Sequence, residues 1–302
     1  MRRFLAGSTP YRSMNSPKTS AQTLSDALHT ATMLLTRVSA SARLDAELLL
    51  EYVTGLSRAT FRAFPERSLP TQAGWAFQQL VMRRLKGEPI AYICGQQEFW
   101  SLLFEVSPAV LIPRPETELL VEQALTHLDA HAQVSVLDLG TGSGAVALAI
   151  ASERRHARMV ATDASKDALA IASRNAARLQ ITNVTFLQGS WYAPLAAARF
   201  DVIVANPPYI ATDDPDVSAE VRKHEPAMAL FCGTSGLEAL TAIVKDAPRH
   251  LAPDGWLLLE HGWKQGPAAR DLLVRAGFGN VRSHTDLAGH ERVSVGQFAA
   301  VV

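Results

Sequence analysis

Residues Val134–Gly144, VSVLDLGTGSG, decide the fold class of this 302-residue chain. An apolar run ends at Asp138, a glycine-rich turn follows, and the apolar run Ala145–Ile150 continues from it. This order predicts a buried strand, a tight turn and a helix whose first backbone N–H groups are free. Similar short apolar runs recur between helical segments downstream, at Met159–Asp163, Val184–Leu187, Phe200–Ala205 and Trp256–Glu260. The alternation predicts an α/β domain with a mostly parallel sheet covered by helices on both faces.

The end of the chain departs from this alternation. A helical segment over Gln265–Ala276 is followed by two extended runs, Asn280–His284 and Arg292–Phe298, with only a short loop between them. So short a loop joins antiparallel neighbours, because a parallel pair needs a long crossover. We therefore expect a terminal antiparallel hairpin at the edge of the sheet.

The residues before the α/β pattern form two further regions. From 22 to 88 the pattern is helical, with Ser41 as an N-cap, Gly55 as a helix stop, and a helix from Thr71 that ends before Gly87. Residues 89–112 contain two short extended runs and predict a hairpin that links the domains. The expected organisation is a small helical substrate-binding domain at 22–88, the linker at 89–112 and a larger domain at 113–302.

Composition limits the classes of function. The chain has 29 basic and 29 acidic residues, and it shows no basic stripe of the kind expected for binding to nucleic acid. No apolar run is long enough to span a membrane. The two cysteines, Cys94 and Cys232, have no metal-ligand spacing and suit a reducing compartment. We expect no metal site, no nucleic-acid partner and no membrane segment.

The first 21 residues carry Arg2, Arg3, Arg12 and Lys18 but no acidic residue. This is the composition of an organellar transit peptide. No apolar face accompanies the arginines, which favours a disordered tail, with Met14 as an alternative start. The expected location is therefore the cytoplasm, or an organellar matrix if the segment is a transit peptide.

The turn Gly140–Gly144 predicts a cofactor site. Taken alone, it also satisfies the dinucleotide pattern G-x-G-x-x-A. Asp163 ends the next strand about twenty residues later, where a carboxylate accepts hydrogen bonds from ribose hydroxyls. Asp138 places negative charge near the ligand, which would repel a pyrophosphate but attract an ammonium and a sulfonium. The pattern favours S-adenosyl-L-methionine over a dinucleotide.

Asn206-Pro207-Pro208-Tyr209, at the end of another strand, predicts the acceptor site. The prolines remove two backbone donors, so the local carbonyls are acceptors. The Asn206 amide oxygen and the Pro207 carbonyl can together accept both hydrogens of an –NH₂ group, and Tyr209 can stack on a flat acceptor. Two such acceptors orient a weakly nucleophilic amide or aryl-amine nitrogen toward a methyl donor, which makes Asn206 and Pro207 the candidate catalytic residues.

With these motifs placed, the chain from residue 22 onward resembles the peptide chain release factor glutamine methyltransferases. The resemblance rests on the sequences at Arg43–Thr54, Gly87–Ile90, Glu98–Ser101, Leu111–Glu118 (LIPRPETE), Asn206–Ile210, Leu259–Gly266 and Glu291–Val293. The N-terminal helical region with LIPRPETE is more specific to this family than the glycine loop. The resemblance implies a class I methyltransferase sheet of seven strands.

The resemblance also implies a reaction and a set of site residues. Methyl would pass from S-adenosyl-L-methionine, leaving S-adenosyl-L-homocysteine, to the glutamine side-chain nitrogen in the Gly-Gly-Gln loop of release factors, which act in translation termination. The implied cofactor-binding residues are Gly140, Thr141, Gly142, Ser143, Gly144, Asp163, Trp191 and Asn206. The implied substrate-binding residues are Asn206, Pro207, Pro208 and Tyr209. Many relatives carry an acidic residue where this chain has Ser190, which weakens an expected contact with the adenine.

Three alternatives share some of these features. A glutamine methyltransferase acting on a ribosomal protein would use the same chemistry. A DNA or RNA amino methyltransferase must also activate a weakly nucleophilic amino nitrogen. The neutral charge of the chain and the lack of a target-recognition insertion weigh against this alternative. A binding module without catalysis would not need both an intact glycine loop and an intact acceptor turn.

Overall fold

Two units, each with its own apolar core, make up the computed structural model. It describes residues 22–299. One unit ends at Gly87 and the other begins at Glu88. The basic segment 1–21 lies outside the described residues, so its assignment as a tail or a transit peptide stays a prediction. Among residues 22–299, every helix is too short or too polar to cross a membrane.

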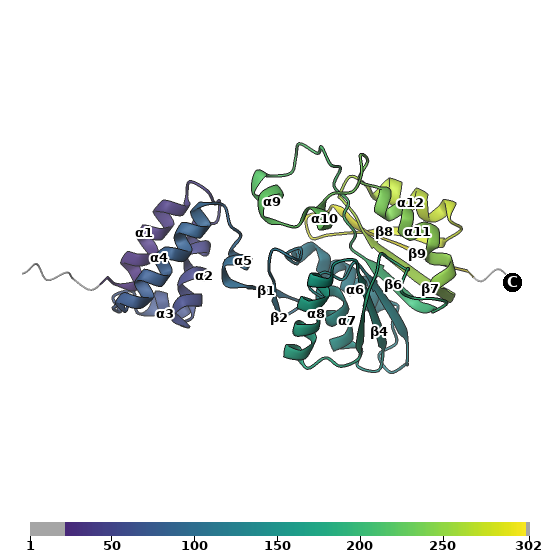
Figure 1. Ribbon diagram of the computed structural model, residues 1–302, viewed down its shortest axis with the longest axis horizontal. Helices are drawn as coiled ribbons and strands as arrows, with labels where there is room; N and C mark the ends of the chain where they lie inside the picture. Colours follow the sequence, from purple (N-terminus) through teal and green to yellow (C-terminus); the bar gives the residue numbers. More distant parts are fainter. Residues whose placement is uncertain (1–21, 300–302) are drawn as a thin grey trace, which may run out of the picture. The chain divides into compact units, whose positions relative to one another are not determined.

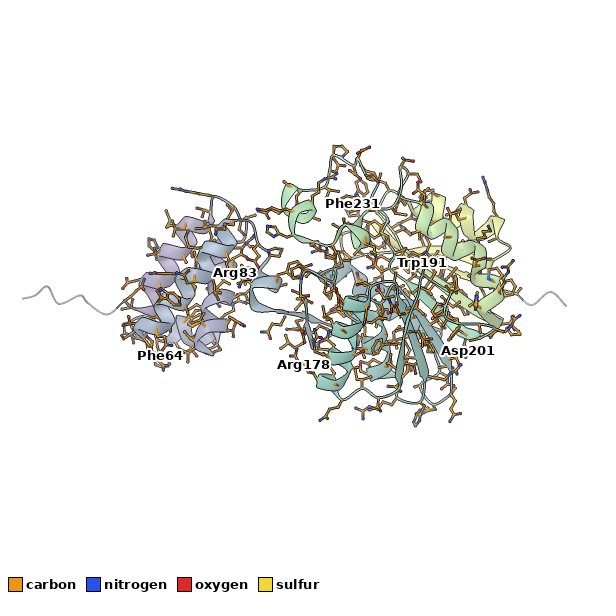
Figure 2. The ribbon with its side chains drawn as sticks, viewed as in Figure 1. Phe64, Arg83, Arg178, Trp191, Asp201 and Phe231 are labelled. Carbon is orange, nitrogen blue, oxygen red and sulfur yellow. The ribbon has the colours of Figure 1, made fainter. Side chains whose placement is uncertain are left out.

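The smaller unit is helical. Its helices are α1 (Leu24–Leu35), α2 (Ala42–Thr54), α3 (Arg58–Ala63) and α4 (Thr71–Leu85). Helix α2 begins after Ser41 and ends at Gly55, whose φ of 66° is the left-handed conformation that glycine adopts without strain. The Ser41 side chain makes no capping hydrogen bond to the helix backbone. Its hydroxyl donates to Asp45 Oδ1 at 3.1 Å instead. Figure 2 shows Phe64, which is 55% exposed, at the surface of this unit.

The second unit begins with a short helix and a hairpin. Helix α5 (Ile90–Cys94), which the sequence pattern did not predict, precedes the antiparallel strands β1 (Gln96–Phe99) and β2 (Leu102–Glu105). The two residues between the strands, Trp100 and Ser101, both have positive φ, as a two-residue hairpin turn with the right twist requires. A 3₁₀ turn, η1 (Pro115–Thr117), then leads into α6 (Glu118–Thr126).

Within residues 22–299, seven strands form the main sheet, in the order β5-β4-β3-β6-β7-β9-β8. They are β3 (Ser135–Leu139), β4 (Arg158–Asp163), β5 (Val184–Gln188), β6 (Phe200–Ala205), β7 (Leu251–Glu260), β8 (Gly279–Thr285) and β9 (Glu291–Gln297). Strands β3 to β7 are parallel, whereas β9 runs antiparallel to both β7 and β8. The predicted fold class and the terminal antiparallel hairpin are confirmed.

Helices cover both faces of the sheet (Figure 1). On one face α6, α7 (Ala145–Glu153) and α8 (Lys166–Leu179) pack against side chains such as Val136 and Val204. On the other face α11 (Glu238–His250) and α12 (Gly266–Arg275) pack against side chains such as Leu137 and Ile203. Neighbouring residues of one strand thus enter different cores, which is why the central strands carry apolar side chains on both faces. Two short helices, α9 (Ala219–His224) and α10 (Ala227–Leu230), lie between β6 and α11 in the chain.

Candidate active site

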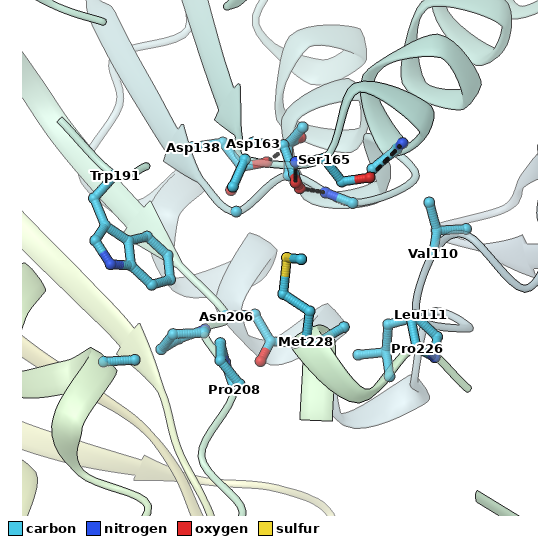
Figure 3. A pocket seen from close by; sticks show the side chains of 18 of the residues that line it. Val110, Leu111, Asp138, Asp163, Ser165, Trp191, Asn206, Pro208, Pro226 and Met228 are labelled. Atoms are coloured by element: carbon cyan, nitrogen blue, oxygen red, sulfur yellow. Dashed lines mark hydrogen bonds between the residues drawn. The ribbon is translucent and has the colours of Figure 1, made fainter. Parts of the chain in front are cut away.

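A cavity of about 550 Å³ lies at the carboxyl ends of β3, β4 and β6. The strand order reverses here, because the chain leaves β3 toward β4 and β5 and returns to pair β6 on the other side. Such a switch point is where open α/β sheets bind ligands. The predicted residues that line the cavity are Gly140, Thr141, Gly142, Ser143, Asp163, Trp191, Asn206, Pro207 and Pro208. The structure brings both predicted motifs into one cavity (Figure 3).

The glycine loop joins β3 to α7, and its glycines serve different purposes. Gly144 is not among the residues that line the cavity. A Cβ at Gly144 would lie 3.2 Å from Ala172 Cβ, so this glycine lets the loop approach α8 closely. Gly142 has a φ of 56°, and a Cβ placed there would have no heavy atom within 4 Å. The loop therefore faces open space at Gly142 and packs against the protein at Gly144.

Asp163, the last residue of β4, holds the loop in place. Its Oδ2 accepts a hydrogen bond from the Gly142 backbone N–H at 2.8 Å, and its Oδ1 accepts one from the Ser165 N–H at 2.8 Å. Each carboxylate oxygen can accept more than one hydrogen bond. Asp163 thus positions the glycine loop while retaining acceptor capacity toward the cavity.

Asp138, the next-to-last residue of β3, lies inside the protein with a relative exposure of 2%. Burial raises the pKa of its carboxyl to about 7, while hydrogen bonds from the Thr141 side chain and the Ala147 backbone oppose that shift. The Thr141 hydroxyl donates to Asp138 Oδ2 at 2.7 Å. Ala147 belongs to the first turn of α7, where backbone N–H groups attract anions. The protein's own carboxylate therefore occupies this anion-attracting position.

Trp191 forms another wall of the cavity, and its ring faces the interior in Figure 3. Its backbone has a φ of 48°, and its carbonyl accepts a hydrogen bond from the Thr162 hydroxyl at 3.0 Å. A Cβ at Gly140 would come within 3.3 Å of the Trp191 ring, so the glycine allows this close approach. Ser190 also lines the cavity, next to Trp191.

The acceptor turn follows β6 on the opposite side of the cavity, where Figure 3 shows Asn206 and Pro208 facing Asp138 and Asp163. The Asn206 side-chain nitrogen donates to the Thr117 hydroxyl at 3.2 Å. With its nitrogen engaged in this way, Asn206 keeps its amide oxygen as an acceptor.

Tyr209 does not line the main cavity. It lines an adjoining cavity of about 380 Å³ together with Asn206, Leu111 and Arg114. Its carbonyl accepts a hydrogen bond from Gln265 Nε2 at 3.0 Å. Burial raises the pKa of the Tyr209 hydroxyl, which therefore stays protonated.

Several residues of the site carried no predicted role. Thr117 lies in the LIPRPETE segment, which marked the family resemblance without assigning this side chain a contact. It is 4% exposed and lines the cavity beside Asn206. Met228 also lines the cavity, from α10, where the sequence shows no motif. Arg114 pairs with the buried Glu225 at 2.5 Å and so ties the LIPRPETE segment to the chain just before α10.

Comparison with known proteins gives a protein-family match in each unit of the chain. The PrmC N-terminal domain family matches residues 26–95, and the methyltransferase small domain family matches residues 116–224. A release factor glutamine methyltransferase of Salmonella typhimurium is 49% identical over 271 residues, which cover 90% of this chain and 97% of that protein. The Pseudomonas aeruginosa protein of the same description is 50% identical over 261 residues, covering 86% and 94% of the two chains.

The chain belongs to the release factor glutamine methyltransferase family. The predicted family resemblance is thus confirmed. Among solved structures, the 16S rRNA N2 G1207 methyltransferase of Thermus thermophilus, in complex with AdoMet and guanosine, has a TM-score of 0.50 at 22% identity. That match covers 67% of this chain and 49% of the neighbour, and it supports the methyltransferase fold of the larger unit.

Proposed function

We propose that this release factor glutamine methyltransferase transfers a methyl group from S-adenosyl-L-methionine to the side-chain amide nitrogen of the glutamine in a release factor's Gly-Gly-Gln loop. One observation carries the proposal. The glycine loop with Asp163 and the acceptor turn with Asn206 line the same cavity, so a donor and an amide can meet there. The relatives are described as release factor glutamine methyltransferases, which supports a release factor glutamine as the acceptor.

The residues present fit a cationic adenosyl donor better than a dinucleotide. The first turn of α7 already hydrogen-bonds the Asp138 carboxyl, so a pyrophosphate there would meet a like charge whenever that carboxyl is ionised. Asp163 would accept from the ribose hydroxyls, and Trp191 would lie against the adenine. When bound, S-adenosyl-L-methionine supplies an electrophilic methyl group on a sulfonium.

On the acceptor side, the chain's own groups bind and orient the amide. The Asn206 amide oxygen and the Pro207 carbonyl accept the two N–H groups of the glutamine amide, and Tyr209 excludes water from the adjoining cavity. These acceptors draw electron density toward a nitrogen whose lone pair is delocalised. Much of the rate then comes from positioning, since well-oriented groups reach effective molarities of ~10⁵ M or more.

The helical unit, residues 22–87, would bind the folded partner. A glutamine side chain alone offers little contact area, whereas exposed apolar side chains on this unit, such as Trp75 and Met82, offer a surface for a protein. Binding energy from parts of the substrate away from the reacting amide can then be used to order the complex.

The experiment is a transfer assay with methyl-labelled S-adenosyl-L-methionine and purified release factor, followed by mass spectrometry of the loop peptide. We expect one methyl group on the loop glutamine and none when that glutamine is replaced. Ribosomal proteins, duplex DNA and single-stranded RNA form the other arms of the assay. Transfer to one of these, or undiminished transfer to the glutamine-replaced factor, would overturn the substrate assignment.

A further inference from the structure

Glu260 is a buried carboxyl beside the acceptor turn that the proposed chemistry does not use. It is the last residue of β7 and is 1% exposed. The register pairs Ala205 of β6 with Leu259 of β7, so the next residues along the chain, Asn206 and Glu260, lie side by side at the carboxyl edge of the sheet. One carboxyl oxygen, Oε2, is buried without a hydrogen-bond partner among the described residues. Burying a carboxyl oxygen without a hydrogen-bond partner costs free energy, so a functional reason for this carboxyl is expected.

The groups around Glu260 come from three other elements. Burial raises the pKa of its carboxyl to about 7. Side-chain hydrogen bonding from Thr117 and Asn206 and the charge of Arg292 favour the ionised form, whereas Glu116 disfavours it. Arg292 itself pairs with Asp286 at 3.0 Å. Thr117 and Asn206 are therefore the neutral partners that hydrogen-bond to this carboxyl.

The direction of hydrogen bonding follows from the chemistry of these three side chains. An ionised carboxylate only accepts hydrogen bonds, so the Thr117 hydroxyl must donate to it. A threonine hydroxyl has one hydrogen, so Thr117 can then only accept from Asn206, as the 3.2 Å contact from Asn206 Nδ2 shows. Without the carboxylate, Thr117 could donate to the Asn206 amide oxygen and occupy the acceptor that the substrate needs.

We propose that Glu260 is a positioning residue for methyl transfer. Directly and through the Thr117 hydroxyl, it holds the Asn206 amide with its nitrogen turned away from the acceptor and its oxygen toward the cavity. The proposal rests on the proposed function, because Asn206 is taken to accept from the glutamine amide. It adds two residues to the acceptor site, neither of which belongs to the Asn-Pro-Pro-Tyr turn.

Four substitutions test this role. Glu260→Met removes the acceptor but keeps an unbranched side chain of similar length, and Glu260→Gln keeps a carbonyl oxygen that can accept from Thr117. Thr117→Val removes the hydroxyl at nearly constant shape, and Thr117→Ser keeps it. Glu122→Gln, which changes an exposed carboxyl on α6, is the control for loss of one negative charge.

Kinetic constants and thermal melting together distinguish a positioning role of these residues from a purely structural one. Glu260→Met and Thr117→Val should lower kcat on release factor by up to about 10²-fold, the scale of a misplaced reacting group, with little change in KM or in cofactor affinity. Glu260→Gln, Thr117→Ser and the control should stay within a few-fold of the wild type. Because both residues act on the same Asn206 amide, their losses should not add, and the double variant should be no slower than the slower single variant. Thermal melting of Glu260→Met should be unchanged or higher, since apolar replacement of a buried charge is often tolerated.

A second measurement does not depend on any methyl acceptor. With ¹⁵N-asparagine labelling, the Asn206 side-chain amide is identified by its loss in Asn206→Ala, and its hydrogen exchange is followed by NMR. We expect exchange to be faster in Glu260→Met and Thr117→Val than in the wild type and in the control. Unchanged exchange, a Glu260→Met turnover within two-fold of wild type, or additive losses in the double variant would each overturn the role of Glu260. A wild-type protein that does not label release factor would instead refute the proposed function, and the NMR result would still decide the positioning.

Discussion

Replacing Asp138 with asparagine should have opposite effects on ligand binding and on the stability of the unliganded protein. Asp138 is buried, and its pKa is raised from 3.8 to about 7. A carboxyl whose pKa is higher in the folded protein than in the unfolded chain favours folding at low pH. That contribution is lost as the pH rises through the folded-state pKa. Without ligand, Asp138→Asn should therefore be more stable than the wild type above about pH 7, because it has no buried charge to accommodate.

For binding of a cationic ligand, the wild type should be favoured over the variant, because such a ligand binds best when Asp138 is ionised. With a pKa of about 7, roughly a tenth of the carboxyl is ionised at about pH 6 and roughly nine tenths at about pH 8. The wild-type affinity for S-adenosyl-L-methionine should then rise about tenfold over this range through Asp138 alone. At about pH 8, loss of the charge should weaken binding by ~1.5–3 kcal/mol, or about 10- to 150-fold.

Titration calorimetry at several pH values between about 6 and 8 measures this, with Asp138→Asn as the matched control. The ligand's own ammonium group titrates equally in both titrations and cancels in the ratio of the two dissociation constants. We expect the dissociation constant of the variant divided by that of the wild type to increase with pH. We also expect the unliganded variant to have a higher melting temperature than the wild type at about pH 8. A ratio that does not change with pH would show that Asp138 does not contact the ligand's positive charge.

Further predictions concern other residues of the site and of the helical unit. Asp163→Ala should weaken cofactor binding by at least ~1.5–3 kcal/mol in calorimetry, since it removes a ribose acceptor and also frees the Gly142 and Ser165 N–H groups; unchanged affinity would remove Asp163 from the site. Asn206→Ala should lower the single-turnover rate by about 10²–10³ with cofactor binding largely kept, and a rate within a few-fold of wild type would exclude it as the acceptor of the amide hydrogens. Trp75→Ala, at a side chain that is 64% exposed, should raise KM for release factor about tenfold if Trp75 anchors the partner, and leave cofactor affinity unchanged; an unchanged KM would place the docking surface elsewhere.

Local patterns in the sequence predicted much of this fold, because strands, turns and helix ends depend on neighbouring residues. Apolar runs at β3, β4 and β6 predicted buried parallel strands, and the short loop before β9 predicted its antiparallel partner. Helix α5 was missed because Ile90–Cys94 is too short to show a helical period. Ser41 was correctly placed before α2, but its side chain donates to Asp45 and does not cap the helix.

The sequence predicted only some of the residues that line the cavity. The glycine loop, Asp163 and the acceptor turn each end a parallel strand, and such ends meet at one edge of the sheet whatever the intervening residues are. Gly144 and Tyr209 belong to those motifs, yet they do not line the main cavity. A motif's spacing determines the path of the backbone, but which of its residues face a ligand depends on how neighbouring elements pack.

The residue pattern alone predicts the class of this protein, an α/β domain covered on both faces, with a glycine loop and an Asn-Pro-Pro-Tyr turn and preceded by a helical region. The groups that surround Asn206 are known only from the fold. Thr117 lies 89 residues before Asn206, and Glu260 lies on a strand placed beside it by the sheet order. Hydrogen bonds and buried charges depend on distance in space, and no local periodicity encodes which distant side chains the fold brings together.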